Sequence, residues 1–148
     1  MIAIDTNCLL RRVLNDDPVQ LAKVNALFAK PDQILITDVV LVEAVWAMQT
    51  FAVPEPGRQD IYAMVRSLFD DAKIEFENKH VVWDALNDFL NAPKSTGKKK
   101  KQADFADTLI INKAKQVINE QPPPANINNG IYTFDAGALM LAGTLVPE

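Results

Sequence analysis

Five acidic residues occupy positions in which their carboxylates could bind a metal ion. They are Asp5, Glu43, Asp104, Asp107 and Asp135. Asp5 and Asp135 each end a short apolar segment, Glu43 interrupts the apolar stretch 39–46, and the other two lie one helical turn apart. Carboxylates gathered within a few ångström repel one another unless a cation neutralises them. If the fold brings these residues together, the cluster requires a metal ion.

The other residue types indicate which metal it would be. The chain has a single histidine, His80, and a single cysteine, Cys8, which argues against zinc held by His or Cys ligands. Hard oxygen ligands favour Mg²⁺ or Mn²⁺. A divalent ion in such a pocket activates water and stabilises charge on a phosphoryl transition state. The acids therefore point to phosphodiester hydrolysis by metal-activated water.

Each acid also has a simpler explanation. Asp5 could cap the helix that follows it, and Glu43 could be a solvated helix residue. Asp104 and Asp107 could be ordinary acids of a helix N-terminus, and Asp135 could be a turn residue. Only their combination supports the hypothesis of a metal site.

The elements that must position these residues alternate along the chain. Short apolar segments predict strands at 2–5, 34–36, 74–77 and 130–135, and helical periodicity predicts the helices between them. This alternation predicts an α/β protein with three layers, α/β/α, around a mainly parallel sheet. Ligand sites of such sheets lie beyond the carboxyl ends of the strands, where Asp5 and Asp135 are expected.

Apolar residues within the predicted helices define the expected core. Trp46 and Met48 are expected in the core, and Cys8 is expected to be a small buried residue. In the helix predicted from 104 to 118, Ile110 is expected to face inward with Phe105, Leu109 and Ala114. His80 is expected on the surface at a helix start.

Size and charge limit the class of protein. A chain of 148 residues, 49% of them hydrophobic, can form one domain, 1–148, without disulfides. A net charge of −4 argues against a general nucleic-acid coat protein. The single cysteine, with no secretion signal and no apolar stretch near the roughly 18 residues that span a bilayer, favours a cytoplasmic protein without membrane contact.

Four segments resemble, in order, the motifs of the PIN domain, and more narrowly of the VapC-type toxins of prokaryotic toxin–antitoxin pairs. They are residues 5–7 (Asp-Thr-Asn), 40–46, 103–110 and 133–135 (Thr-Phe-Asp). Each motif alone is unspecific. Together they span nearly the whole chain and form a specific combination.

The resemblance implies a Mg²⁺-dependent endoribonuclease with a PIN-like fold, the toxin of a type II toxin–antitoxin system. Asp5 and Asp107 would be the principal metal ligands, and Glu43 would bind a second ion or position water. Asp135 would bind the metal directly or through water, and Asp104 is the alternative third acid. The polar groups that orient these carboxylates would be Thr6, Asn7 and Thr133.

The resemblance also implies partners: RNA as substrate, a cognate antitoxin protein, and a second copy of the chain in a homodimer. RNA phosphates could be held by the basic residues Arg11, Lys98, Lys99, Lys100 and Lys101. The lysine run is longer and more basic than is usual for the family, and it could equally be a solvated loop. The loop 121–129 looks like an insertion, and residues 136–138 lack the basic residue that many relatives have.

Two other functions compete with the nuclease. A phosphotransfer or receiver domain would need a second acid near Asp5, but Thr6 and Asn7 follow it. A non-catalytic PIN-fold module that binds protein or RNA remains the alternative. The RNA target, the number of metal ions and the choice between Asp104 and Asp107 stay open.

Overall fold

The computed structural model describes residues 1–30, 32–122 and 130–148. Most of the predicted 121–129 insertion lies outside these residues. The chain forms two compact units, Met1–Lys79 and His80–Glu148, and each is described by itself. The predicted single domain, 1–148, spans both.

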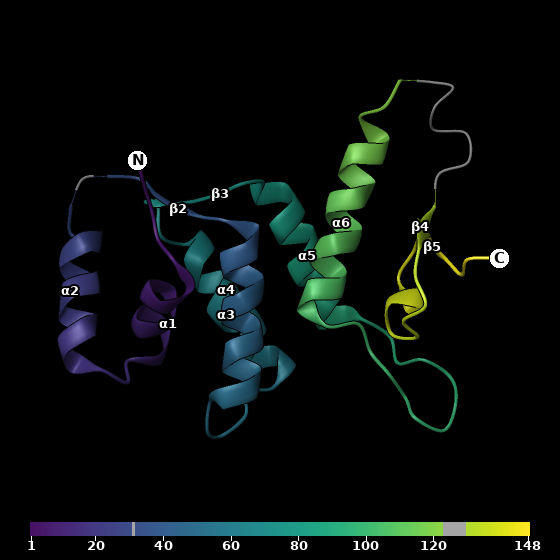
Figure 1. Ribbon diagram of the computed structural model, residues 1–148, viewed down its shortest axis with the longest axis horizontal. Helices are drawn as coiled ribbons and strands as arrows, with labels where there is room; N and C mark the ends of the chain where they lie inside the picture. Colours follow the sequence, from purple (N-terminus) through teal and green to yellow (C-terminus); the bar gives the residue numbers. More distant parts are fainter. Residues whose placement is uncertain (31, 123–129) are drawn as a thin grey trace. The chain divides into compact units, whose positions relative to one another are not determined.

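The first unit contains a three-stranded parallel sheet (Figure 1). Its strands are β1 (Ile2–Ala3), β2 (Ile34–Ile36) and β3 (Ile74–Phe76), in the order β1-β2-β3. Ile34 pairs with Ile2 on one side and with Ile74 on the other. The predicted strands at the start of the chain and at 74–77 are shorter in the structure, because helices begin at Thr6 and Lys79, soon after each strand ends.

Four helices complete the first unit: α1 (Thr6–Leu14), α2 (Pro18–Phe28), α3 (Asp38–Phe51) and α4 (Arg58–Phe69). Local polar residues start three of them. Asp5 caps α1, Asp17 caps α2 and Thr37 caps α3, each accepting a hydrogen bond from a backbone N–H of the first turn. Helices α1 and α3 lie side by side, so residues of the two helices can share a surface (Figure 1).

Helix α3 corrects one prediction about the core. Met48 is buried as predicted, but 57% of Trp46 is exposed. The buried side of α3 carries Leu41, Ala44, Val45 and Met48, the spacing of one helical face. Trp46 falls off this face, so the prediction of a core tryptophan was wrong. Cys8 is only half-buried.

The second unit holds α5 (Lys79–Asn91), which begins at the last residue of the first unit, and α6 (Phe105–Asn119). The short strands β4 (Ile131–Tyr132) and β5 (Thr144–Leu145) pair in parallel, and the 3-10 helix η1 (Ala138–Met140) precedes β5 (Figure 1). Phe89 and Phe105 meet edge to face, with ring centroids 5.9 Å apart. Both rings are buried and join α5 to α6.

Helix α6 corrects a second prediction: Ile110 was expected to face inward, but it is 63% exposed. Two polar residues, Thr108 and Asn112, are buried instead. Thr108 donates to the Phe105 carbonyl at 2.9 Å, and Asn112 donates to Asp88 and to the Thr108 carbonyl, both at 2.9 Å. Satisfied hydrogen bonds let polar side chains occupy these inward positions.

The α/β class is confirmed, and every strand pair in the described residues is parallel. Each unit has its own small sheet, β1–β3 in the first and β4–β5 in the second. Among the described helices, none is both long and apolar enough to cross a bilayer.

Candidate metal centre

Asp5 is the N-cap of α1 and is exposed. Its Oδ1 accepts a hydrogen bond from the Cys8 backbone N–H at 2.8 Å. This bond is the main cause of a lowered Asp5 pKa, so the carboxylate is charged at neutral pH. The cap also fixes the direction of the side chain at the end of the first strand segment. A carboxylate oxygen that caps a helix keeps lone pairs with which it can bind a cation.

Glu43 lies on the exposed side of α3 and meets the start of α1. Its Oε2 accepts a hydrogen bond from the Thr6 hydroxyl at 2.5 Å. Asp5, Thr6, Asn7 and Glu43 line one depression of about 360 Å³ together with Leu10, Trp46, Ala47 and Phe51. The structure therefore brings together the predicted acids of the first unit, Asp5 and Glu43, with Thr6 and Asn7.

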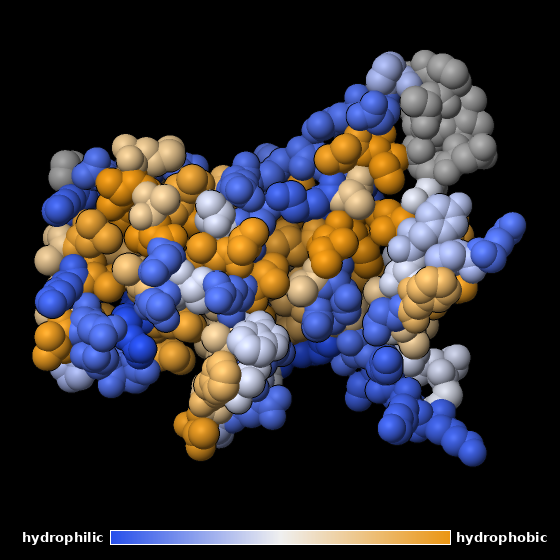
Figure 2. Space-filling model, in the orientation of Figure 1, coloured by the Kyte–Doolittle hydropathy of each residue, from blue (hydrophilic) through white to orange (hydrophobic). Residues whose placement is uncertain are grey.

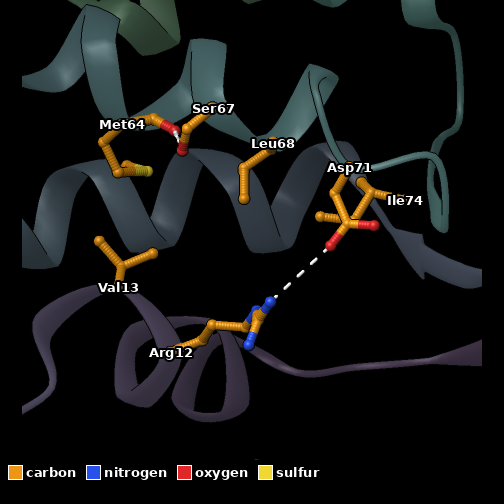
Figure 3. A pocket seen from close by; sticks show the side chains of 7 residues that line it. All are labelled: Arg12, Val13, Met64, Ser67, Leu68, Asp71 and Ile74. Atoms are coloured by element: carbon orange, nitrogen blue, oxygen red, sulfur yellow. Dashed lines mark hydrogen bonds and ion pairs between the residues drawn. The ribbon is translucent and has the colours of Figure 1, made fainter. Parts of the chain in front are cut away.

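A second depression of the first unit lies between α1 and α4 and contains none of the predicted acids (Figure 3). Its volume is about 410 Å³, and Figure 3 shows Arg12 reaching across it toward Asp71, 3.8 Å away. Arg12 also donates to Asn25 at 2.8 Å and lies 4.1 Å from the Phe28 ring centroid. These contacts give Arg12 a structural role in joining α1 to α2 and to the turn that follows α4.

Arg11, predicted to bind RNA phosphates, forms hydrogen bonds with other side chains of the first unit. It donates to both carboxylate oxygens of Asp16 at 2.6 Å and to Gln20 at 2.9 Å. A phosphate would have to compete with Asp16 for this guanidinium. RNA binding by Arg11 stays a prediction.

Asp104 and Asp107 cap α6 reciprocally. The Asp107 N–H donates to Asp104 Oδ1 at 2.8 Å, and the Asp104 N–H donates to Asp107 Oδ2 at 3.0 Å. This is a capping box, with Asp in the place of the usual Glu. Both acids therefore act as helix-start residues, as the simpler explanation expects. The same hydrogen bonds hold both carboxylates in fixed positions.

Asp107 differs from the other acids in its electrostatics. Burial raises its pKa above the usual range, and the nearby charges of Asp104 and Asp135 raise it further, against the lowering effect of the Asp104 backbone N–H. The charged form of Asp107 is therefore disfavoured in the folded protein. A bound cation would remove this penalty.

Asp135 is held by the loop that follows β4. Its Oδ1 accepts from the backbone N–H groups of Gly137 at 2.8 Å and Ala138 at 2.9 Å. The Ala138 bond is the main cause of a lowered Asp135 pKa, and the Lys101 ammonium, 3.7 Å away, adds to it. The Asp135 backbone N–H in turn donates to the Thr133 hydroxyl at 3.0 Å. This bond does not involve the carboxylate, so the orienting role of Thr133 stays a prediction.

Gly137 is a residue of this centre that the sequence did not single out as functional. A Cβ at this position would lie 2.6 Å from the Gln102 carbonyl carbon and 2.7 Å from the Ala103 nitrogen. Because backbone cannot move aside cheaply, only glycine lets the Asp135 loop rest on the segment just before Asp104. No local sequence pattern signals this contact, because it joins residues that are far apart in the chain.

Gly137→Ala is expected to lower the free energy of unfolding by about 1–3 kcal/mol, the usual cost of overpacking. Urea denaturation followed by circular dichroism measures this change. Gly57→Ala is the matched control, since a Cβ there would come no closer than 3.5 Å to a side-chain atom, Asp60 Oδ2. Equal stability of the two variants would refute the close approach of the loop.

The predicted basic loop is exposed at Lys98, Lys99, Lys100 and Lys101. Figure 2 shows the segment between α5 and α6 as a hydrophilic protrusion. Ser95 closes its base, since its N–H donates to the Lys101 carbonyl at 2.7 Å and its Oγ accepts from the Lys101 N–H at 2.9 Å. The closed loop places Lys101 beside Asp135.

The five predicted acids thus form two groups: Asp5 with Glu43 in the first unit, and Asp104, Asp107 and Asp135 in the second. In the part of the chain that the structure describes, no three His, Cys, Asp or Glu side chains are placed to hold a metal ion. The donor set within each group is oxygen only, which fits Mg²⁺ or Mn²⁺ in kind. The lone His80 is exposed, as predicted.

Comparison of the chain with protein-family models, with curated proteins and with solved structures found no match.

Proposed function

We propose that this chain is a Mg²⁺-dependent endoribonuclease whose metal ligands come from both groups of acids. The observation that carries this proposal is the acidic group of the second unit, Asp104, Asp107 and Asp135. Asp107 is partly buried there, its pKa is raised by burial and by the charges of the other two, and hydrogen bonds with Asp104 fix its position. Carboxylates held in this way are costly without a cation.

The contacts within each unit support the fit to a hard cation. Each carboxylate is fixed by hydrogen bonds from groups that would hold it in place for metal binding: Cys8 N–H for Asp5, the Thr6 hydroxyl for Glu43, and two loop N–H groups for Asp135. Such supporting bonds orient metal ligands.

In this proposal Asp5 and Asp107 are the principal ligands, Asp104 is the alternative third acid, and Asp135 binds directly or through water. Glu43 binds a second ion or orients the attacking water, with Thr6 and Asn7 beside it. Lys101 pairs with Asp135, and it would be free to contact a substrate phosphate if a cation bound that carboxylate. The bound Mg²⁺ or Mn²⁺ would activate water and stabilise charge on the phosphoryl group.

The resemblance of the four motif segments extends the proposal to fold and biology. The chain would have the three-layer α/β/α arrangement of a PIN domain and act in the cytoplasm as the toxin of a type II toxin–antitoxin pair. It would be a homodimer kept inactive by its antitoxin.

Metal removal tests the activity. The purified protein is expected to cleave single-stranded RNA internally with Mg²⁺, to lose this activity in EDTA, and to regain it with excess Mg²⁺ or Mn²⁺. Gel electrophoresis of an end-labelled RNA measures the cleavage. Cleavage that persists in EDTA would contradict the proposal, and RNA binding without cleavage would favour the non-catalytic module.

A further inference from the structure

Two aromatic side chains lie exposed beside the acids of the first unit. Trp46 is 57% exposed and Phe51 is 70% exposed. Their ring centroids are 5.7 Å apart with an interplanar angle of 89°, so the edge of one ring meets the face of the other. Exposed large aromatic side chains of this kind commonly belong to binding surfaces.

The pair shares a depression with the carboxylates. Trp46 lies one turn after Glu43 on α3, on the same side of the helix. The lining of this 360 Å³ depression has a polar part, Asp5, Thr6, Asn7 and Glu43, and an apolar part, Leu10, Trp46, Ala47 and Phe51. Both parts are within one unit of the protein.

We propose that Trp46 and Phe51 form a stacking site for an unpaired base of the RNA substrate, next to the carboxylates that bind the metal. This inference rests on the proposed nuclease function and names the side chains that would contact a base of its single-stranded substrate. Bases in single strands are free to stack on aromatic side chains, whereas paired bases are not.

The charges of the depression favour a nucleotide over a protein segment. An apolar peptide placed there would bury Asp5 and Glu43 away from water without a counterion. A nucleotide, like the lining, has an apolar part and a polar part. Its base could pack on the aromatic side chains, and its phosphate could share a cation with the carboxylates. Because none of the described residues that line the depression is Lys or Arg, we expect binding at this site to depend on the divalent ion.

Tryptophan fluorescence can report this contact directly. The chain has two tryptophans, so Trp83→Phe leaves Trp46 as the only one. The probe is a twelve-nucleotide single-stranded RNA, compared with its duplex, mixed in a stopped-flow instrument and read before hydrolysis. We expect saturable quenching by the single strand with Mg²⁺, none in EDTA, and binding of the duplex at least about 10-fold weaker.

Steady-state cleavage of the same single strand gives an independent readout. Trp46→Ala and Phe51→Ala are each expected to raise KM about 10-fold, with a smaller change in kcat, whereas Trp46→Phe keeps KM within about threefold. Val19→Ala, which removes an exposed apolar side chain of α2 outside the depression, is expected to leave KM unchanged.

The outcomes separate this inference from the nuclease proposal. Normal KM in Trp46→Ala, or equal quenching by duplex and single strand, would overturn the stacking site while leaving the nuclease intact. Loss of a dimer in Trp46→Ala without a change in KM would also overturn it, because the rings would then bind a second copy. If wild-type protein cleaves no RNA, the nuclease proposal fails, and Mg²⁺-dependent quenching still decides the stacking site.

Discussion

Asp107→Asn is expected to lower RNA cleavage by more than about 100-fold, which exceeds the loss typical of residues that only orient a metal ligand. The Asn side chain can still accept the Asp104 N–H, so the capping box survives and only the charge is lost. A cleavage time course on end-labelled RNA measures the loss.

The same variant should not lose stability in the absence of metal. Because the Asp107 pKa is raised in the folded protein, the native state binds more protons than the unfolded state above the ordinary pKa of 3.8. The free energy of unfolding therefore falls as pH rises through the raised pKa, and Asp107 opposes folding at neutral pH. Asn removes this penalty, so we expect the variant to be at least as stable as wild type at pH 7, with the difference vanishing below pH 3.8.

Thermal unfolding with and without Mg²⁺ checks this expectation. Mg²⁺ should raise the Tm of the wild type, since it binds the folded state, and should not raise that of Asp107→Asn. Asp60→Asn is the matched control: Asp60 has the same place in α4, where its Oδ2 accepts from the Gly57 N–H at 2.8 Å. If Asp60→Asn impairs cleavage as strongly as Asp107→Asn, helix capping and not metal binding explains the effect.

Asp5→Asn is expected to abolish cleavage to a similar degree, by more than about 100-fold, because it removes the other principal ligand. Asn is as good an N-cap as Asp, so α1 should remain intact and the midpoint of urea unfolding should change little. Cleavage rates and urea denaturation of the same preparation separate the two effects.

Asp17→Asn is the control for Asp5→Asn. Asp17 caps α2 in the same manner, accepting from the Val19 and Gln20 N–H groups at 3.0 Å. It does not line the depression that contains Asp5. We expect Asp17→Asn to cleave RNA at the wild-type rate. Full activity in Asp5→Asn would exclude Asp5 as a metal ligand.

The local structure around the acids could be predicted from the sequence because it depends on neighbouring residues. Asp followed by Pro is a common helix start, and the structure places Asp17 as the N-cap of α2, with Pro18 as its first residue. The pairing of Asp104 with Asp107 one turn later predicted a shared helix start, and the capping box confirms it. Strand β2 was predicted with its observed bounds from three consecutive apolar residues, Ile34–Ile36.

The remaining features depend on contacts between distant segments. Trp46 lies off the buried face of α3 although its neighbours are apolar, so composition alone suggested a core residue. On α6, Thr108 and Asn112 are buried and Ile110 is exposed. Asn112 can be buried because Asp88 of α5 accepts its hydrogen bond. The requirement for glycine at 137 arises from the Gln102–Ala103 backbone, which no local pattern reveals.

All of the proposed chemistry requires Asp5 and Asp107 to bind one and the same cation. Mn²⁺ tests this in a ¹H–¹⁵N spectrum, because a bound paramagnetic ion broadens the resonances of nearby amides. We predict that the amides of Thr6, Asn7, Asp107 and Gly137 broaden together at the same Mn²⁺ concentration, recover with excess Mg²⁺, and all stay sharp in Asp5→Asn. Broadening confined to the amides of one unit, or unchanged at Gly137 in Asp5→Asn, would contradict a shared metal site.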